Sequence, residues 1–445
     1  MPFDGFGLPD DLWLLAGVVG DFVRGEIRPV EDELPGDARE IPRARLQPLQ
    51  AKAREAGLWC FEAPQQYGGG GLSAFQSVVV TEQAAKHRFS FPLPGAGAFG
   101  FSPPVVLYRG SPQQIERYVV PTIEHGWSSF TAISEPTGGS DPARAIRTTA
   151  LRRGDRYVLN GRKMWATNAD EASYGVVYAR TDPAAGRLGI SALIVEAGTP
   201  GMHVTPVAVL RDHHSTEVTF EDCEIPVENL IGEEGQGFQL AQEWLVRGRL
   251  LYAAQAVGVA EEALRIAVDW ARQRETFGAL LATRQAVQFA IADARVEINA
   301  ARHLTWEAAY AHDQGQDARS AASIAKLYGT EMGFRVMDAM MQIMGDGDGQ
   351  GAPAGGLVSG AAGRSGRRGA QRDPPLSAGA RDPGGRGDRA ALGALAAHSL
   401  HLIEHPTGSV SAGSGERPAS SASRAPRSQA PFWEGSSWSA SGAPR

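Results

Sequence analysis

The sequence has few cysteines, no long apolar run and no excess of basic residues. Cys60 and Cys223 are the two cysteines among 445 residues, so neither a disulfide framework nor a thiolate metal site is available. The apolar run near the start, residues 12–19, is too short to cross a bilayer and follows two aspartates, which is unlike a signal peptide. The net charge of -7 argues against a nucleic-acid partner. These absences predict a cytoplasmic protein without a membrane span.

What is present is a change of pattern along the chain. Up to about residue 126, apolar residues recur at spacings of three and four, as in residues 46–58, which predicts helices. From about 128 to 229 the chain has short β-prone runs, and Asn160-Gly161 predicts a two-residue hairpin turn there. Helical periodicity returns in three long stretches, residues 238–274, 283–311 and 318–344.

These patterns predict an α+β architecture. Residues 1–127 are expected to form an N-terminal helical domain, residues 128–236 a central β domain and residues 237–345 a bundle of long helices. The tail, residues 346–445, is rich in Gly, Arg and Ser and has no apolar periodicity. That composition is typical of a disordered segment, and an RNA-binding function for its arginines is the less economical interpretation.

Several separated motifs share one order with a known family. Residues 131–141 read TAISEPTGGSD and residues 157–168 read YVLNGRKMWATN; residues 217–222 (EVTFED), 232–238 (GEEGQGF) and 274–278 (RETFG) follow. Taken alone, each has an ordinary structural explanation, such as a Gly- and Pro-containing turn or a core aromatic residue. Together they resemble the acyl-CoA dehydrogenase family over about residues 1–345, because its two flavin-contacting segments read Thr-Glu-Pro-x-x-Gly-Ser-Asp and Leu-Asn-Gly-x-Lys-x-Trp-Ile-Thr-Asn.

The resemblance implies a function and partners. We expect an FAD-dependent enzyme that dehydrogenates an acyl-CoA thioester to the trans-2-enoyl-CoA and passes the electrons to an electron-transfer flavoprotein. A homodimer or homotetramer is also implied, because part of the family's flavin site comes from a neighbouring subunit. Acyl chain length is not readable from the sequence, since it depends on the depth of a cavity.

The resemblance also names site residues. Ser134 is expected near the pyrimidine side of the flavin ring, Thr167 near N5, and the indole of Trp165 against the ring. Ser140 and Arg249 are the expected substrate contacts, whereas Arg274, Gln285 and the Gln342 segment are expected to act across the subunit interface. The full set of expected flavin-binding residues is Ala132, Ile133, Ser134, Ser140, Trp165, Ala166, Thr167, Arg274, Thr276, Phe277, Gln285, Gln342 and Gly345.

The family's catalytic carboxylate has no counterpart in the sequence. In the family, a Glu removes the α-proton, and it occupies one of two locations. The first immediately precedes the arginine that here is Arg249, and this chain has Gly248 there. The second is a Glu-Gly motif towards the end of the bundle, which is absent from the sequence. No catalytic residue is therefore assigned.

A frame shift would explain both the missing motif and the unusual tail. Back-translation from about Asp346 with G+C-rich codons, read one base later, gives a peptide that fits the family. In that reading the catalytic Glu overlaps the codons of Arg368 and Gly369. Loss of the last helices would leave apolar bundle residues exposed and lower stability; the residues expected to be exposed are Ile324, Leu327, Phe334 and Met337.

Two alternative functions stay open at this point. One is a flavin oxidase or monooxygenase on the same fold, in which oxygen replaces the protein acceptor. The other is a non-catalytic family member that binds FAD or acyl-CoA, which Gly248 favours. A metal site at His213 and His214 is not expected, because adjacent residues of a strand point to opposite faces.

Overall fold

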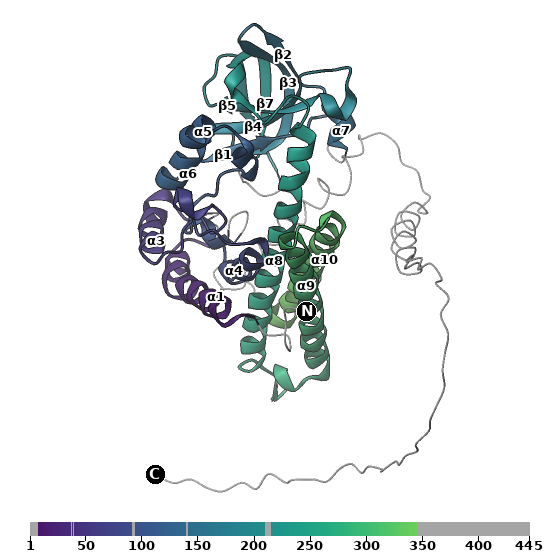
Figure 1. The fold of residues 1–445 in the computed structure, drawn as a ribbon. Helices are drawn as coiled ribbons and strands as arrows, with labels where there is room; N and C mark the ends of the chain where they lie inside the picture. The colour runs from purple at the N-terminus through teal and green to yellow at the C-terminus, as the bar shows by residue number, and fades with distance from the viewer. Residues whose placement is uncertain are drawn as a thin grey trace, which may run out of the picture. The chain divides into compact units, whose positions relative to one another are not determined.

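A computed structural model describes residues 8–345, apart from residues 37, 39, 91–93, 139–140 and 210–214. The order of its elements along the chain is helical, then β, then helical again, which confirms the expected fold class (Figure 1). The predicted disorder and the proposed frame shift after residue 345 concern residues outside this described part.

The N-terminal part is built from helices and short helical turns. Its α-helices are α1 (Asp10–Phe22), α2 (Arg28–Asp32), α3 (Arg43–Glu55), α4 (Ala74–Ala84), α5 (Pro112–Gln114) and α6 (Val120–His125), and a π-helical turn η1 (Val23–Ile27) joins α1 to α2. A capping box starts α4, since the Ser73 hydroxyl accepts from the Gln76 backbone N–H and the Gln76 side chain accepts from the Ser73 N–H. This first helical region therefore matches the periodicity of its sequence.

The central part is a mainly antiparallel sheet. Its strands are β1 (Ser129–Ala132), β2 (Thr149–Arg153), β3 (Arg156–Thr167), β4 (Tyr174–Arg180), β5 (Ile190–Glu196), β6 (Met202–Pro206), β7 (Ser215–Pro226) and β8 (Leu230–Ile231). They lie in the order β6-β7-β3-β2-β4-β5-β8, and β1 pairs in parallel with β4. One short helix, α7 (Pro142–Ala145), interrupts the connection from β1 to β2.

The predicted hairpin at Asn160-Gly161 is wrong. Both residues lie inside β3, where the register against β7 shifts between Leu159 and Gly161, and a side chain at Gly161 would collide with Thr148. The two-residue turn lies at Gly154 and Asp155 instead, because Arg153 pairs with Arg156. An Asn-Gly pair supplies a bulge as readily as a turn, and only the neighbouring strand decides between them.

Three long helices form the third part. They are α8 (Gly237–Ala271), α9 (Gln285–Asp313) and α10 (Arg319–Met344), and they lie side by side (Figure 1). The first residue of α8 packs directly on β5, because a side chain at Gly237 would collide with Ser191. The 35 residues of α8 then extend about 50 Å from the sheet, at 1.5 Å per residue.

The expected exposure of bundle residues is confirmed at three positions and wrong at one. Ile324, Leu327 and Phe334 expose 49%, 42% and 39% of their surface, but Met337 is 4% exposed. Met337 is buried because it belongs to the apolar cluster between α8, α9 and α10. Helical spacing alone did not distinguish the face of α10 towards α8 from its outer face.

A close contact between α4 and α8 sets the position of α8. A Cβ at Gly258 would lie 2.1 Å from the Glu82 carbonyl oxygen of α4, so Gly258→Ala should lower the free energy of unfolding by about 1–3 kcal/mol. Gly17, in α1, makes the matched control because a Cβ there meets nothing within 4 Å. Gly17→Ala should raise stability by ~0.5–1 kcal/mol. Urea denaturation of both variants measures this; equal effects would contradict the packing.

Candidate active site

One buried lysine connects the two segments in which the flavin residues were expected. Lys163, on β3, is fully buried, and its Nζ lies 2.9 Å from Oε1 of Glu135. The same Nζ donates to the Ile133 carbonyl oxygen at 3.2 Å. Ile133 and Glu135 are the two neighbours of Ser134, whose own carbonyl oxygen accepts from the Met164 backbone N–H at 2.9 Å. Lys163 and Met164 therefore fix the Ser134 loop against β3.

The carboxylate of Glu135 has every partner that a buried anion needs. Besides Lys163, it accepts from the backbone N–H groups of Arg147 and Thr148, each at 2.9 Å, and from the Thr148 hydroxyl at 2.8 Å. Burial acts to raise the pKa of Glu135, but the Lys163 ammonium and these N–H groups outweigh it and hold that pKa below its usual range. Burial lowers the pKa of Lys163 to about 8 against the opposing effect of Glu135. Both groups are thus charged at neutral pH.

The end of β3 has an unusual backbone. The register against β7 shifts between Met164 and Ala166, and Trp165 and Asn168 have φ angles of 65° and 60°. Residues other than glycine rarely adopt these positive φ angles. Those that do are concentrated at functional sites, where an unusual backbone directs a side chain outwards. The bulge leaves Trp165 44% exposed while Ala166 is buried.

The hydroxyl groups of the Ser134 loop and of the end of β3 are suited to a flat ring that carries hydrogen-bond acceptors. Among the described residues, neither the Ser134 nor the Thr167 hydroxyl has a hydrogen-bond partner, and both residues are half-buried. The loop and the strand end thus offer two hydroxyl donors and one exposed indole within the same fixed segment pair. This arrangement fits the isoalloxazine ring that the sequence led us to expect. Ala132, also expected there, is the buried last residue of β1.

The substrate side of the expected site begins on α8. Arg249 is half-buried, burial lowers the pKa of its guanidinium, and no described carboxylate forms an ion pair with it. Beside it, a Cβ at Gly248 would meet nothing within 4 Å. Two carboxylates that pair with or belong to α8 are engaged: Glu62, from the N-terminal part, binds Arg247 at 2.5 Å, and Glu243, on α8, binds Arg109 at 3.2 Å. Among the described residues, the Arg249 guanidinium therefore has no carboxylate partner.

A cavity of about 610 Å³ lies between α7, the loop before β5 and the start of α8. Arg144, Arg180, Arg187 and Phe238 contribute to its wall. Arg180 is committed to structure, since it donates to the carbonyl oxygens of residues 143, 146 and 186. Arg187 has no described partner and is exposed, so it is available to an anion.

The remaining expected residues lie at the opposite end of α8. Arg274, Thr276 and Phe277 belong to the connection between α8 and α9, which includes the small hairpin of β9 (Glu275–Thr276) and β10 (Ala279–Leu280), and Gln285 is the first residue of α9. Phe277 is fully exposed. Gln342 and Gly345, at the end of α10, are exposed. They lie at this same end of α8 because the two helices run in the same direction, with Gly329 against Ala253 and Gly333 against Ala256.

Three residues considered in the sequence analysis fall outside the described part of the chain. Ser140 and the pair His213 and His214 lie outside the described residues. No group of three potential metal ligands occurs in the part that is described. Both cysteines are buried free thiols, and burial raises the pKa of Cys60 to about 12, which makes that thiol a poor nucleophile.

Glu135 and Lys163 belong to the two motifs, but the sequence alone gave neither residue a role. One signal was available in the sequence: an acidic residue follows Ser134 and a basic residue lies two positions before Trp165, so the two could form an ion pair. What the sequence could not show is that both are buried and that they meet.

Comparison with known proteins gives one consistent family. The chain matches three domain models of the acyl-CoA dehydrogenase family. These are the N-terminal domain over residues 10–125, the middle domain over residues 131–223 and the C-terminal domain over residues 235–352. It is 36% identical to an acyl-CoA dehydrogenase of Bacillus subtilis over 75% of this chain and 87% of that protein. It is 34% identical to a mitochondrial short-chain specific acyl-CoA dehydrogenase of Mus musculus, over 76% of this chain and 81% of that protein.

Solved structures agree with these relatives. A chain described under the electron-transferring flavoprotein of Acidaminococcus fermentans superposes with a TM-score of 0.72 at 32% identity, covering 82% of this chain and 95% of that one. The similarity therefore extends over most of the length of both proteins.

The Lys163 contact gives a direct test of the site's construction. Lys163→Met should lower the free energy of unfolding by about 3–5 kcal/mol, because it leaves the buried Glu135 carboxylate without its cation. Adding Glu135→Gln should recover part of that loss, since the unpaired charge is then removed. Chemical denaturation at pH 7 measures both. Additive losses in the double variant would contradict a direct charge interaction.

Proposed function

The chain belongs to the acyl-CoA dehydrogenase family, and we propose that it binds FAD between the Ser134 loop and the end of β3, where it dehydrogenates an acyl-CoA thioester. Members of this family are FAD-dependent oxidoreductases that act on CH–CH groups. The observation that carries the proposed location is the Lys163 contact, because it brings Ser134, Trp165 and Thr167 together with their polar groups free.

Each residue of the proposed site has a separate task. FAD, when bound, supplies the acceptor for a hydride from the β-carbon of the acyl group. With FAD bound, the hydroxyls of Ser134 and Thr167 would be the hydrogen-bond donors that hold the ring, and Trp165 would pack against it. Arg249 carries a cation that no described carboxylate neutralises, and such a charge stabilises negative charge that develops on a thioester oxygen.

The product would be the trans-2-enoyl-CoA and the electron acceptor an electron-transfer flavoprotein. Support for this acceptor comes from the solved A. fermentans chain, whose description concerns such a flavoprotein. The mouse relative supports a short acyl chain.

A cytoplasmic site of action is part of the same proposal, and the two buried free thiols are compatible with a reducing compartment. In the described part of the chain, no helix combines the length and the apolar composition needed to cross a membrane.

A complete flavin site requires a second copy of the chain. The Ser134 loop adjoins the sheet at the start of α8, whereas Arg274 and Phe277 follow its end, about 50 Å away along the helix. One FAD cannot contact both groups of a single chain. We therefore assign Arg274, Thr276, Phe277, Gln285, Gln342 and Gly345 to the FAD of a neighbouring subunit in a homodimer or homotetramer, and the full exposure of Phe277 supports this.

The nucleotide end of the thioester is proposed to occupy the 610 Å³ cavity beside α7. Phosphates are favoured there by Arg187, which pairs with no described residue, and by Arg144, whose contact with Asp141 at 3.4 Å is solvent-exposed and weak. Asp141, which lines this cavity, follows in sequence Ser140, an expected contact of the substrate.

The chain as written is proposed to be a slow dehydrogenase. Gly248 occupies one of the two family locations for the base, and the other location falls outside the described residues. A general base contributes typically 10²–10⁴ to a rate, so its absence would leave binding nearly intact and turnover low. The same observation favours a second candidate function, a non-catalytic member that binds FAD and acyl-CoA. An oxidase or monooxygenase would differ by consuming oxygen with the substrate.

Restoring a base at residue 248 tests the dehydrogenase proposal. Space is open there, so Gly248→Glu in the FAD-loaded protein should speed flavin reduction by butyryl-CoA about 10²–10⁴-fold. Stopped-flow absorbance of the flavin measures the rate. Gly248→Gln is the matched control, with the same size and no basic carboxylate. Equal rates for the two variants would mean that residue 248 does not face the α-carbon.

Removing a charge tests the proposed nucleotide cavity. Arg187→Gln in the FAD-loaded chain should weaken CoA binding about ten-fold, because a contact between a guanidinium and a phosphate is lost. Pantetheine, which lacks the nucleotide, should bind the two proteins equally. Titration calorimetry compares both ligands, and Arg152→Gln, on β2, serves as a charge control. Unchanged CoA affinity would exclude this cavity without affecting the dehydrogenase proposal.

A further inference from the structure

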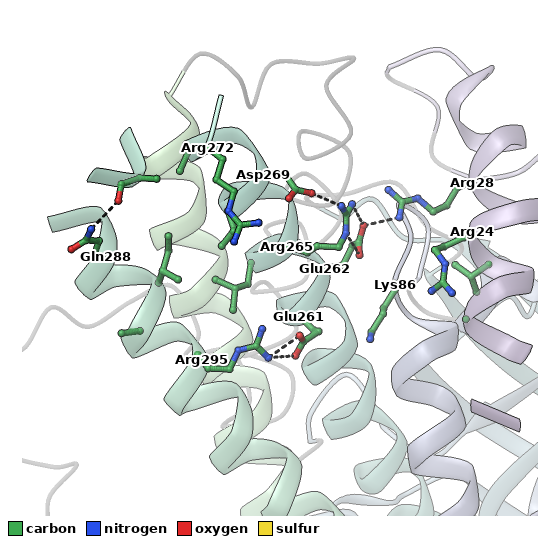
Figure 2. Close-up of a pocket in the computed structure, with 18 residues that line it drawn as sticks. Arg24, Arg28, Lys86, Glu261, Glu262, Arg265, Asp269, Arg272, Gln288 and Arg295 are labelled. Carbon is green, nitrogen blue, oxygen red and sulfur yellow. Dashed lines mark hydrogen bonds and ion pairs between the residues drawn. The ribbon is translucent and has the colours of Figure 1, made fainter. Parts of the chain in front are cut away.

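We propose that a second cavity, between the N-terminal helices and the far half of α8, binds an amphipathic anion of the fatty carboxylate class. The cavity has a volume of about 720 Å³ and is lined by residues of α1, η1, α2, α8 and α9 and by Lys86, which follows α4 (Figure 2). That volume lies within the range of small-molecule sites. The inference does not depend on the proposed function.

Most charges on the wall neutralise each other. Glu262, buried, accepts from Arg28 and from Arg265, each at 2.7 Å, and Arg265 also reaches Asp269 at 2.7 Å. On the other side, Arg295 pairs with Glu261 at 2.8 Å. Figure 2 shows Arg28, Glu262, Arg265 and Asp269 as one connected series and Arg295 with Glu261 as a separate pair. The three guanidinium groups of these pairs are matched by three carboxylates, so this part of the wall is close to neutral.

Two further cations face the cavity without any such partner. Lys86 and Arg272 both line it, and neither forms an ion pair or hydrogen bond through its side chain with another described residue. Figure 2 accordingly draws no dashed line to either side chain. They come from different parts of the fold, one after α4 and the other at the end of α8. An anion bound at either of them would neutralise a charge that no other described residue pairs with.

The floor of the cavity is apolar. Val268 and Ile291, both half-buried, provide the apolar surface that water can reach, whereas Val23, Leu264 and Ala271 also line the cavity but are at most 2% exposed. A small inorganic anion would leave this surface in contact with water, whereas an alkyl chain would cover it. The combination of unpaired cations and an apolar floor is therefore selective for a molecule that has an acidic head and a hydrocarbon chain.

This cavity is separate from the proposed substrate site at Gly248, although Arg272 and Gln288 in its wall are close in sequence to Arg274 and Gln285. Gly248 and Arg265 lie on the same helix and are 17 residues apart by number, which corresponds to about 25 Å. A ligand in the cavity would contact α1, α8 and α9 at once. It would stabilise the packing of the N-terminal helices on the bundle without entering the substrate site.

Calorimetric titration with decanoate tests the proposal. Decanoate should bind the full chain, and 1-decanol, which has the same alkyl chain without the charge, should bind at least ten-fold more weakly. The double variant Lys86→Gln with Arg272→Gln should lose at least ten-fold in decanoate affinity. Arg152→Gln removes an exposed positive charge from β2 and should leave the affinity unchanged. Equal binding of decanoate and decanol, or no binding of either, would overturn the proposal.

A steric variant locates the bound molecule. Ala292 lines the cavity and is exposed, so Ala292→Trp should fill the space and abolish decanoate binding while the melting temperature of the ligand-free protein stays within a few degrees. Saturating CoA should not compete with decanoate. Displacement by CoA, or full affinity in Ala292→Trp, would put decanoate elsewhere and overturn the assignment.

Discussion

The buried ammonium of Lys163 is the interaction on which the proposed flavin site depends. It lies in a strand that is paired on both sides, yet it contacts a loop that precedes it by some thirty residues in the sequence. A buried charge is costly unless all its partners are in place. The Ser134 loop therefore has one position that satisfies both Glu135 and Lys163, and that position presents the Ser134 hydroxyl beside the end of β3.

The length and straight course of α8 determine how the rest of the molecule is used. Its first turn packs on the sheet at Ser191, its middle packs on α4 through Gly258, and its last turns line the cavity of Figure 2. One rigid helix thus separates the two groups of expected flavin residues by about 50 Å. The proposed second subunit follows from this separation, and the full exposure of Phe277 supports it.

In the proposed function, binding and catalysis depend on different residues of this chain. The groups that would hold a flavin and a thioester are part of the fold, since Lys163, Glu135 and the Trp165 bulge also stabilise the sheet. A catalytic base contributes nothing to that stability, so a glycine at residue 248 is tolerated by the helix and leaves open space. The fold can therefore persist where the chemistry is reduced.

Motif order and helical periodicity in the sequence determined the family, the three-part α+β architecture and the three long helices, because each depends on local pattern. Tertiary structure decided the rest. Asn160-Gly161 became a bulge because β7 and Thr148 pack against it, and Met337 became core because α10 turns that face to α8. The pairing of Glu135 with Lys163 was also decided there, since the energy of an ion pair depends on burial and distance, and a sequence contains neither.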